Sequence, residues 1–427
     1  MKLNLPRGMR DIDAEEFSSI NYIKNRFMRT ANLFNFKILQ PSPLEMLSTL
    51  EAKGGPTISK EIYNFKDKGD REVALRFDLT VGLTRYISQK RELKLPIKVA
   101  SFGGVWRYDE PQAGRYRYFH QWDVELYDAY NLEHEAEIIQ LASSFFEDLG
   151  LKVTIDISHR ELLEQYMKKE LGMSDSRLAF EVFRAMDKVQ KKGMEAVYSE
   201  YVNTISPTIL KPLLELSSQI GTINEIEDQA PKLTNLPKWT SLRDLESSLS
   251  ARGVNNLRIN LGIVRGLDYY SGTVFEIFDP TSTIGALAGG GRFDILTSAF
   301  DRPDIGAVGV AGGVERLLDV LCHHGLLKVE TKPLVFVTSE DSNKKLVLEI
   351  VSQLRGAGIA ADYDSRIRPL RKQIGYGSSI GATILVKVER NGSEISIVAK
   401  SLISGQEATG KRNRVLELVS EILQSTK

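Results

Sequence analysis

Alternating hydrophobic and polar residues predict two β-strands around which we expect the chain to be organised. In residues 117–127, the face expected to be buried carries Tyr118, His120, Trp122, Val124 and Leu126. The opposite face presents an aromatic ring, an amide and two carboxylates, from Phe119, Gln121, Asp123 and Glu125. Residues 72–80 alternate in the same way and would place Arg76, Asp78 and Thr80 on a polar face.

The strand at 117–127 follows a loop and a second strand, which ends at residues 105–108. The loop, residues 109–116, contains Pro111 and Gly114, which turns favour. Gly103 and Gly104 lie inside the earlier strand, where glycine often marks a bulge or the close approach of a ligand. A lone alternating strand is typical of a solvated surface, but this glycine pair favours a hairpin that borders a binding site.

Amphipathic helices are predicted on either side of these strands. The first follows Asp11 or Asp13, either of which can cap it, and its buried stripe would be Phe17, Ile20, Phe27 and Ala31. Residues 85–95 and 132–149 predict further helices, and residues 36–40 a short strand before Pro41. Residues 160–250 are rich in helix-forming residues and predict a helical insertion.

Strand patterns return after the insertion, at residues 257–264 and in the glycine-punctuated segment 306–321, which ends as a helix. Arg316 would lie in the first turn of that helix, where the helix dipole disfavours a cation, so we expect it to serve an anionic ligand. After Gly325, strands at 335–337, 360–364 and 382–388 alternate with helices at 344–354, 368–376 and 414–423. This alternation predicts a small α/β domain.

The composition excludes several classes of protein. A chain of 427 residues predicts two or three domains, and a single cysteine, Cys322, excludes a disulfide framework or a cysteine-based zinc site. No signal peptide or membrane-length apolar run is present, which predicts a cytoplasmic protein without membrane contact. The whole chain has 56 Lys and Arg residues and 56 Asp and Glu residues, so its formal net charge is zero. Residues 332–427 contain 15 basic and 10 acidic residues, which gives this segment a local charge of +5.

Together these segments resemble the three motifs of class II aminoacyl-tRNA synthetases. The strand ending at Pro41 resembles the first motif, which builds a dimer interface, and residues 309–316 resemble the third. Trp106-Arg107-Tyr108-Asp109 resembles the second motif, with Asp109 in place of the usual Glu. Within the class, RGLDYYSGTVFE (265–276), GRYRYFHQ (114–121) and LRFDLT (75–80) resemble the signatures of the histidyl-tRNA synthetase family.

The resemblance covers the whole chain and implies an α+β fold. We expect an antiparallel catalytic core at residues 1–159 and 251–325, a helical insertion at 160–250 and an α/β anticodon-binding domain at 332–427, in a homodimer. The implied enzyme is an ATP-dependent histidine–tRNA ligase. It would join histidine to the α-phosphate of ATP, release pyrophosphate, and transfer the histidyl group to the 3′ end of tRNA(His).

The resemblance also implies roles for single residues in the first step. Charge develops on the α-phosphate, and cations held in place there should dominate catalysis. The implied catalytic residues are Arg107, Arg265 and Gln121, and in this family the arginine at the position of Arg265 replaces a metal ion of other class II enzymes. The implied ATP-binding residues are Arg107, Asp109, Arg115, Phe119 and Arg316. Magnesium is expected with ATP, without a protein-bound metal or resident cofactor.

Further residues follow from the same resemblance for the amino acid and the tRNA. Histidine would contact Asp78, Leu79, Thr80, Arg107, Gln121, Glu125, Arg265, Tyr269 and Tyr270. The side chains of Asp78, Thr80 and Gln121 would hold its ammonium group, and those of Glu125 and Tyr270 its imidazole. The tRNA would contact Glu110 and Gln112 near its acceptor end, and Arg366, Arg371, Lys372 and Gln373 near its anticodon.

Two other functions compete with this interpretation. Relatives of histidyl-tRNA synthetases serve as regulatory subunits of the first enzyme of histidine biosynthesis, but they typically lack the motif arginines and the anticodon-binding domain. This chain retains Arg107, Arg265 and Arg316. A class II synthetase for threonine, proline or glycine would be expected to lack the RGLDYY segment, and the threonyl enzyme uses a zinc site that one cysteine disfavours.

Overall fold

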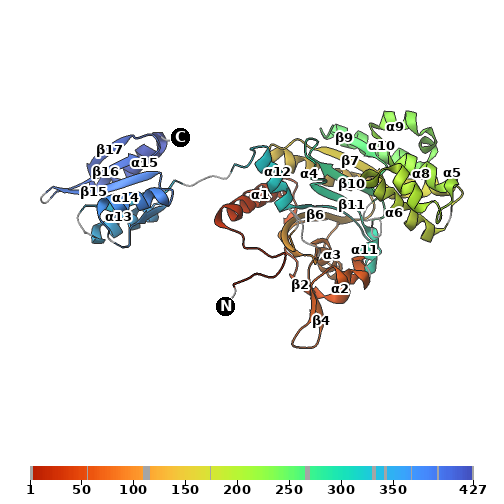
Figure 1. Cartoon of the computed structure of the whole chain (residues 1–427), viewed down its shortest axis with the longest axis horizontal. Coiled ribbons are helices and arrows are strands. Elements are labelled where there is room, and N and C mark those ends of the chain that lie inside the picture. The colour runs from red at the N-terminus through yellow and green to blue at the C-terminus, as the bar shows by residue number, and fades with distance from the viewer. Residues whose placement is uncertain are drawn as a thin grey trace. The chain divides into compact units, whose positions relative to one another are not determined.

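The computed structural model describes residues 3–54, 56–108, 116–173, 175–264, 270–328, 333–340, 344–366, 368–391 and 394–425. The chain divides into two compact units, Met1–Val329 and Glu330–Lys427 (Figure 1). Among the described residues, every helix is too short or too polar to cross a lipid bilayer.

The larger unit is built on a nine-stranded sheet. Six consecutive strands, β5-β6-β12-β11-β10-β7, pair antiparallel, and parallel pairs attach β1 to β5 and β9 to β7. From edge to edge the strands are β1 Lys37–Ile38, β5 Ile97–Trp106, β6 Tyr118–Asp128, β12 Gly306–Gly313, β11 Ala288–Arg292, β10 Thr273–Phe278, β7 Thr154–His159, β9 Leu257–Asn260 and β8 Ile220–Gly221.

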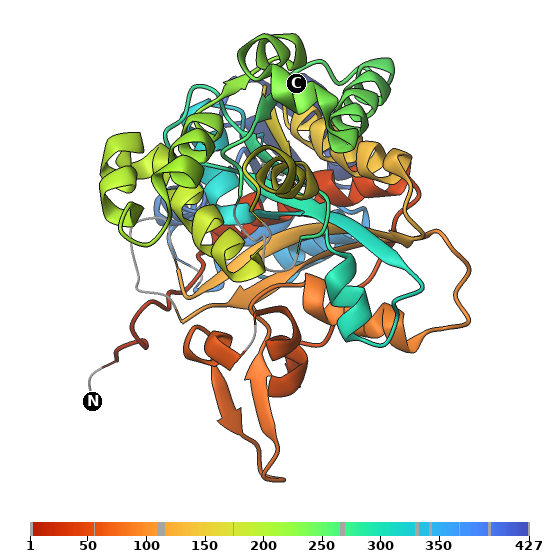
Figure 2. The same ribbon diagram turned by 90° about the vertical axis from the view of Figure 1, so that its right-hand side faces the viewer.

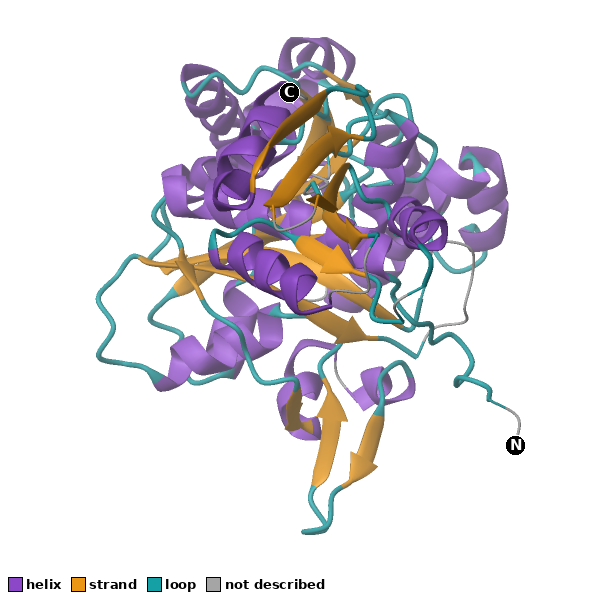
Figure 3. Cartoon of the chain, turned by 90° about the vertical axis from the view of Figure 1, so that its left-hand side faces the viewer, coloured by secondary structure: helices purple, strands orange, loops and turns teal. Residues whose placement is uncertain are grey.

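Helices cover both faces of this sheet (Figure 3). On one face, α1 (Ala14–Leu33), α4 (Leu132–Asp148) and α12 (Val314–His323) enclose an aromatic core. There the ring of Trp122 lies 5.6 Å from that of Phe27 and 5.0 Å from that of Phe145. On the other face, α3 (Thr80–Gln89) and α11 (Asp294–Ala299) pack over a separate apolar cluster.

Burial on both faces corrects one expectation for β6. The face of Trp122, Val124 and Leu126 is buried as predicted, but the polar face is buried too. Gln121, Asp123 and Glu125 are exposed by 7%, 0% and 1% of their surface. These polar groups therefore lie inside the protein, where each must find a partner in the protein or in a ligand.

The predicted buried stripe of α1 is wrong at one position. Ile20, Phe27 and Ala31 are buried, whereas Phe17 is 60% exposed. The buried arc of α1 also includes Ile23, and at about 100° per residue Phe17 lies beside this arc and not within it. Asp13 caps the helix by accepting a hydrogen bond from Glu16 N at 2.9 Å, as predicted.

The alternation of residues 72–80 does not correspond to one strand. Strand β4 (Glu72–Leu75) ends early, and helix α3 begins at Thr80, five residues before the predicted helix. The apolar residues of the pattern pack into different clusters, Phe77 near α2 (Leu47–Gly54) and Leu79 near α3. Asp78 lies between the two elements and accepts a hydrogen bond from Val81 N at 3.2 Å.

A small sheet, in the order β2-β4-β3, projects from the nine-stranded sheet (Figure 2). It comprises β2 (Leu44–Met46), β4 and β3 (Asn64–Lys66), with α2 (Leu47–Gly54) and the 3₁₀ helix Pro56–Lys60 beside it. The buried Arg76 ties it to the main sheet by donating to Gly104 O at 2.8 Å and to Pro41 O at 2.6 Å.

The same contacts correct the interpretation of the glycine pair. A Cβ at Gly103 would meet Arg76 Nη2 at 2.7 Å, and one at Gly104 would meet the Tyr118 ring at 2.3 Å. These glycines make room for the protein's own side chains, and not for a ligand.

Helices that follow β7 form the insertion, at the β9 edge of the sheet (Figure 1). They are α5 Arg160–Glu170, α6 Ser176–Lys192, α7 Met194–Tyr201, α8 Pro207–Ser217, α9 Ile223–Gln229, the 3₁₀ helix Pro231–Asn235 and α10 Pro237–Ala251. Strand β8 lies among them in sequence and pairs with β9, so the insertion extends the main sheet. Strands β7 and β8 were not predicted.

The smaller unit is a five-stranded sheet in the order β14-β13-β15-β16-β17. Its strands are β13 Val335–Ser339, β14 Ala361–Tyr363, β15 Ile384–Asn391, β16 Glu394–Ser401 and β17 Glu407–Lys411. Its helices are α13 Lys344–Gly356, α14 Leu370–Ser379, the 3₁₀ helix Arg412–Arg414 and α15 Val415–Ser425. The predicted α/β alternation is present, but strands β16 and β17 were not predicted.

A buried ion pair links α4 to the main sheet and provides a test of this fold. Arg292 Nε lies 2.7 Å from Glu135 Oε1, and Thr273 donates to the other oxygen at 2.9 Å. Arg292→Met would leave the Glu135 carboxylate buried without its cation and should lower the free energy of unfolding by about 3–5 kcal/mol. Urea unfolding followed by tryptophan fluorescence measures this, because all three tryptophans belong to this unit.

The control is Arg184→Met on α6, which breaks an exposed pair with Glu181. It should cost less than about 1 kcal/mol. Equal losses for the two variants would contradict a structural role for the buried pair.

Candidate active site

Two adjoining cavities open on the polar face of β6. The larger has a volume of about 340 Å³ and the smaller about 220 Å³. Arg107, Gln121, Gly289 and Ala311 line both, so the cavities meet at these residues.

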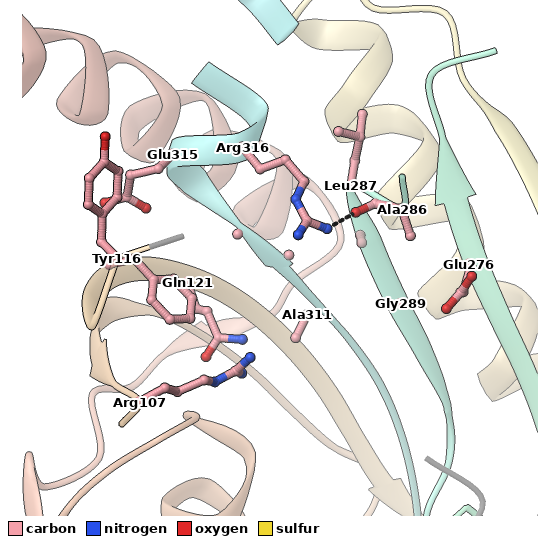
Figure 4. A pocket seen from close by; sticks show the side chains of 14 residues that line it. Arg107, Tyr116, Gln121, Glu276, Ala286, Leu287, Gly289, Ala311, Glu315 and Arg316 are labelled. Atoms are coloured by element: carbon pink, nitrogen blue, oxygen red, sulfur yellow. Dashed lines mark hydrogen bonds between the residues drawn. The ribbon is translucent and has the colours of Figure 1, made fainter. Parts of the chain in front are cut away.

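Two arginines enter the larger cavity from opposite sides (Figure 4). Arg107 follows β5, donates from Nε to Phe77 O at 3.1 Å and places its guanidinium carbon 5.1 Å from the centre of the Phe119 ring. Arg316 comes from the first turn of α12 and donates to Ala286 O at 2.5 Å. An aromatic ring with two guanidinium groups suits a planar base that carries phosphates.

The residue before Arg316 holds the cavity wall together. Glu315 accepts hydrogen bonds from His120 N and His120 Nδ1, both at 2.9 Å. This pair fixes the start of α12 against β6, and the sequence pattern did not predict it. Of the two charged residues in this turn, Glu315 therefore stabilises the site while Arg316 is directed into it.

The smaller cavity is lined by charged and polar residues from separate parts of the chain. They are Lys53 of α2, Asp78 and Thr80 at the start of α3, Arg107, Gln121 and Glu125 of the hairpin, and Tyr270. Across the sheet Glu125 lies opposite Gly309. A Cβ at Gly309 would meet Glu125 Cγ at 2.9 Å, so the glycine of β12 leaves room for the carboxylate.

This wall offers several acceptors that the described residues leave unused. Gln121 Oε1 and Glu125 Oε1 in this wall are buried and accept no hydrogen bond from any described residue. The same holds for Oδ1 of Asp123, which lies between them on β6 but lines neither cavity. The other oxygens are engaged: Tyr127 donates to Glu125, and Thr80 donates to Asp123 at 3.3 Å. Buried acceptors in one wall fit a small ligand rich in N–H donors.

Burial also changes the acidity of the two carboxylates. It raises the pKa of Asp123 to about 7, helped by the nearby Asp78 and opposed by Lys53. It raises the pKa of Glu125 well above its ordinary value, with Asp123 adding to the effect. A cationic ligand would stabilise the ionised forms of both groups.

Lys53 is a site residue that the sequence did not reveal. Its Nζ lies 2.6 Å from Asp78 Oδ2, and both side chains are largely buried. Burial disfavours the ammonium form, but Asp78, Tyr270 and Asp123 together outweigh this effect, and the pKa of Lys53 is raised. A lysine near the end of a short helix is typical of a solvated surface, so no local pattern marks it.

The structure brings most of the described predicted residues together. Asp78, Thr80, Arg107, Gln121, Glu125 and Tyr270 line the smaller cavity, and Arg107, Gln121, Phe119 and Arg316 the larger. Leu79 is fully buried in the cluster under α3 and lines neither cavity. Asp109, Glu110, Gln112, Arg115, Arg265 and Tyr269 lie outside the described residues.

The four residues predicted near the anticodon belong to the smaller unit. Arg366, Arg371 and Lys372 are exposed, and the last two lie in the first turn of α14. Gln373 is half-buried and donates from Nε2 to Arg368 O at 2.7 Å, so its amide supports the loop before the helix. The described residues contain no cluster of three His, Cys, Asp or Glu that could hold a metal ion.

Comparison with known proteins decides the family. A profile described as "Histidyl-tRNA synthetase" matches residues 8–317. The chain belongs to the histidyl-tRNA synthetase family. This confirms the predicted family, the class II α+β fold, and an ATP-dependent aminoacyl-tRNA ligase as the class of enzyme.

Relatives of the family extend over the whole chain. The chain is 31% identical to a histidine–tRNA ligase of Thermococcus kodakarensis, over 99% of each protein, and 29% identical to one of Phocaeicola vulgatus, over 98% and 99%. In fold it is similar to histidyl-tRNA synthetase from Nostoc sp. PCC 7120, with a TM-score of 0.81, 22% identity and coverage of 99% and 100%.

A second solved structure has a double name. It is described as an ATP phosphoribosyltransferase regulatory subunit/histidyl-tRNA synthetase from Bacillus halodurans. The TM-score is 0.70 at 22% identity, with coverage of 84% of this chain and 92% of that one. This likeness shows the shared fold.

The raised pKa of Asp123 predicts an unusual pH dependence of stability. The pKa of Asp123 is near 4 in the unfolded chain and about 7 in the folded protein. Between these two pH values the folded protein binds more protons at Asp123 than the unfolded chain does, so its stability falls as the pH rises. Asp123→Asn removes this loss. The free energy of unfolding of the variant relative to the wild type should therefore increase by roughly 3 kcal/mol from pH 4.5 to pH 7.5.

Urea unfolding at several pH values measures this difference. The groups that face Asp123 are Asp78, which strengthens the shift, and Lys53 and Arg107, which weaken it. Asp128→Asn, at the end of the same strand, is the control for the general effect of replacing a carboxylate by an amide on β6. A difference for Asp123→Asn that does not change with pH would contradict a folded pKa near 7.

Proposed function

We propose that this chain is a histidine–tRNA ligase that activates L-histidine with ATP and transfers it to the 3′ end of tRNA(His). The observation that carries the proposal is the pair of adjoining cavities that share Arg107 and Gln121. One cavity suits a nucleotide and the other a small cationic ligand, so their junction is where a carboxylate and an α-phosphate would meet.

ATP would bind in the larger cavity. Its adenine would lie between Phe119 and the guanidinium of Arg316, with Asp109 near its amino group and Arg115 on the outer phosphates. Arg107 at the junction would contact the α-phosphate, with Arg265 as a second cation. Both would stabilise the negative charge that develops as the histidine carboxylate attacks and pyrophosphate leaves.

Histidine would bind in the smaller cavity. Its ammonium group would be held by Asp78, Thr80 and Gln121, and its imidazole by Glu125 and Tyr270, with Tyr269 adjoining. Leu79, which lines neither cavity, would act only through its neighbours Asp78 and Thr80. The unused acceptors Gln121 Oε1 and Glu125 Oε1 are suited to N–H donors of this substrate. Substrates that lack these donors would leave the buried groups unpaired, which is an effective basis for discrimination.

Magnesium would enter with ATP and be held chiefly by its phosphates. The carboxylate of Glu276 lines the larger cavity and suits a hard cation of this kind. The ion would neutralise phosphate charge, whereas Arg107 and Arg316 orient the nucleotide.

For the macromolecular partners, the proposal assigns tRNA to the hairpin loop and to the smaller unit. Glu110 and Gln112 would lie near the acceptor end, and the exposed Arg366, Arg371 and Lys372, with Gln373, near the anticodon. A cytoplasmic homodimer would form through the region around Pro41. Exposed apolar residues there support such an interface: Ile38, Leu44 and Met46 are 41%, 39% and 45% exposed.

A regulatory subunit is the second candidate, because the Bacillus halodurans neighbour carries that description. The described cavity retains Arg107 and Arg316, which such a subunit would not need. The chain also has a C-terminal unit, Glu330–Lys427, and its similarity to histidine–tRNA ligases extends over this unit. Both observations favour the ligase.

The experiment that tests the proposal is ATP–pyrophosphate exchange with magnesium across the twenty amino acids. We expect exchange with histidine alone, because the buried acceptors select its donors. Aminoacylation of tRNA(His) then tests the second step. Folded protein without exchange for any amino acid would contradict the proposal and favour the regulatory subunit.

A substitution at the junction tests the assigned chemistry. Arg107→Ala should lower kcat for pyrophosphate exchange by about 100- to 1,000-fold, since it removes a cation aimed at the developing charge. We expect Arg265→Ala to behave similarly. Arg184→Ala, an exposed arginine of α6, is the control and should leave kcat unchanged. Near-normal exchange in folded Arg107→Ala would contradict the role of this residue.

A further inference from the structure

The smaller cavity already holds a cation on the carboxylate that we assign to the substrate's ammonium group. Lys53 Nζ lies 2.6 Å from Asp78 Oδ2, and both side chains line the cavity. The second Asp78 oxygen accepts from Val81 N at the start of α3. An incoming ammonium group would therefore share Asp78 with Lys53, and two like charges at one carboxylate repel each other.

A second carboxylate lies beside this pair, and none of the ion pairs among the described residues involves it. Asp123 is fully buried, and its Oδ1 accepts no hydrogen bond from the described residues. Its Oδ2 accepts from Thr80, which is two residues from Asp78, and Lys53 interacts electrostatically with both carboxylates, more strongly with Asp78. Lys53 thus lies within the electrostatic reach of two carboxylates and is paired with one of them.

Binding of an amino acid changes this balance of charges. Before binding, Lys53 is the described cation that acts most strongly on Asp123, ahead of Arg107, and binding adds a further cation at Asp78. With Lys53 still on Asp78, one carboxylate would carry both cations while the buried Asp123 carried none. If Lys53 moves, each cation has its own carboxylate, which lowers both the repulsion and the cost of an unpaired buried charge.

We propose that Lys53 passes from Asp78 to Asp123 when histidine binds, so that the substrate's ammonium group takes its place on Asp78. Lys53 and Asp123 are then positioning residues for the amino-acid pocket. The flexible four-carbon stem of lysine allows an ammonium group to change partners without movement of the backbone. The inference rests on the role of Asp78 in the proposed function.

This movement of Lys53 makes binding in the pocket depend on the ammonium group of the ligand. A ligand with an imidazole and a carboxylate but no ammonium, such as imidazolepropionic acid, would leave Lys53 on Asp78. Its affinity would then not depend on whether residue 123 can accept a cation. Histidine, by contrast, would need Asp123 as the second anion.

Pyrophosphate exchange by the full chain tests the inference through a double-mutant cycle. In Asp123→Asn, Lys53 has no second carboxylate and competes for Asp78, so KM for histidine should rise about tenfold or more at unchanged kcat. Adding Lys53→Met removes the competing cation. KM for histidine in the double variant should therefore return to within about threefold of the wild type.

Two readouts separate this effect from a general disturbance of the pocket. KM for ATP and the inhibition constant of imidazolepropionic acid should stay at wild-type values in Asp123→Asn, because neither ligand displaces Lys53. Lys60→Met, an exposed lysine of the 3₁₀ helix after α2, is the matched control for the loss of a lysine. It should leave all constants unchanged.

Several outcomes would overturn the inference. An unchanged KM for histidine in Asp123→Asn would do so, as would a double variant with a KM as high as that of the single one. If Asp123→Asn does not fold, Lys53→Met alone decides. A KM for histidine within about threefold of the wild type supports the movement of Lys53 to Asp123. A rise of about tenfold in this KM would instead show that Lys53 holds Asp78 in place. Absence of histidine-dependent exchange in the wild type would overturn the proposed function as well.

Discussion

Strand β6 carries an amide and two carboxylates on a face that is as fully buried as its apolar face, and the larger unit is arranged around this constraint. Buried carboxylates are costly unless they are paired or bound to a ligand. Helix α3 and the segment before it supply Thr80 and Asp78, α2 supplies Lys53, and Tyr127 of the same strand donates to Glu125. The remaining acceptors of Gln121 and Glu125 line the cavity wall, so polar groups that are costly to bury in the fold are suited to a cationic substrate.

The glycines of the neighbouring strands follow from the same constraint. On β12, Gly309 lies opposite Glu125 and leaves space that a side chain would fill, while Gly312 does the same for Trp122 on the other face. On β5, Gly103 and Gly104 make room for Arg76 and Tyr118. The glycine-rich pattern typical of this family therefore reflects close packing around large or charged side chains of β6 and its neighbours. Open space for a ligand results at Gly289, which lines both cavities.

Hydrogen bonds of charged side chains join the walls of the two cavities to separate elements of the structure. Glu315 binds His120 and so joins α12 to the hairpin beside the larger cavity. Arg76 joins the small projecting sheet to the hairpin, and this sheet precedes the segment that carries Asp78. Arg107 stands where the two cavities meet. An enzyme that joins an amino acid to a nucleotide needs such an arrangement, because each substrate must be held rigidly relative to the other.

The sequence by itself determined the family, the chemistry of the hairpin and the positions of most strands and helices. Alternation placed Gln121 and Glu125 on one face, and the signature segments pointed to Arg107, Asp78 and Arg316, which line the cavities, because these signals are local in the chain. The tertiary structure decided what depends on contacts between distant segments. It buried the polar face of β6, replaced the strand expected at residues 76–80 by a turn and a helix, and left Phe17 exposed. It also brought Lys53 to Asp78 across 25 residues of sequence, a pairing that local patterns cannot encode because it arises from packing of α2 against α3.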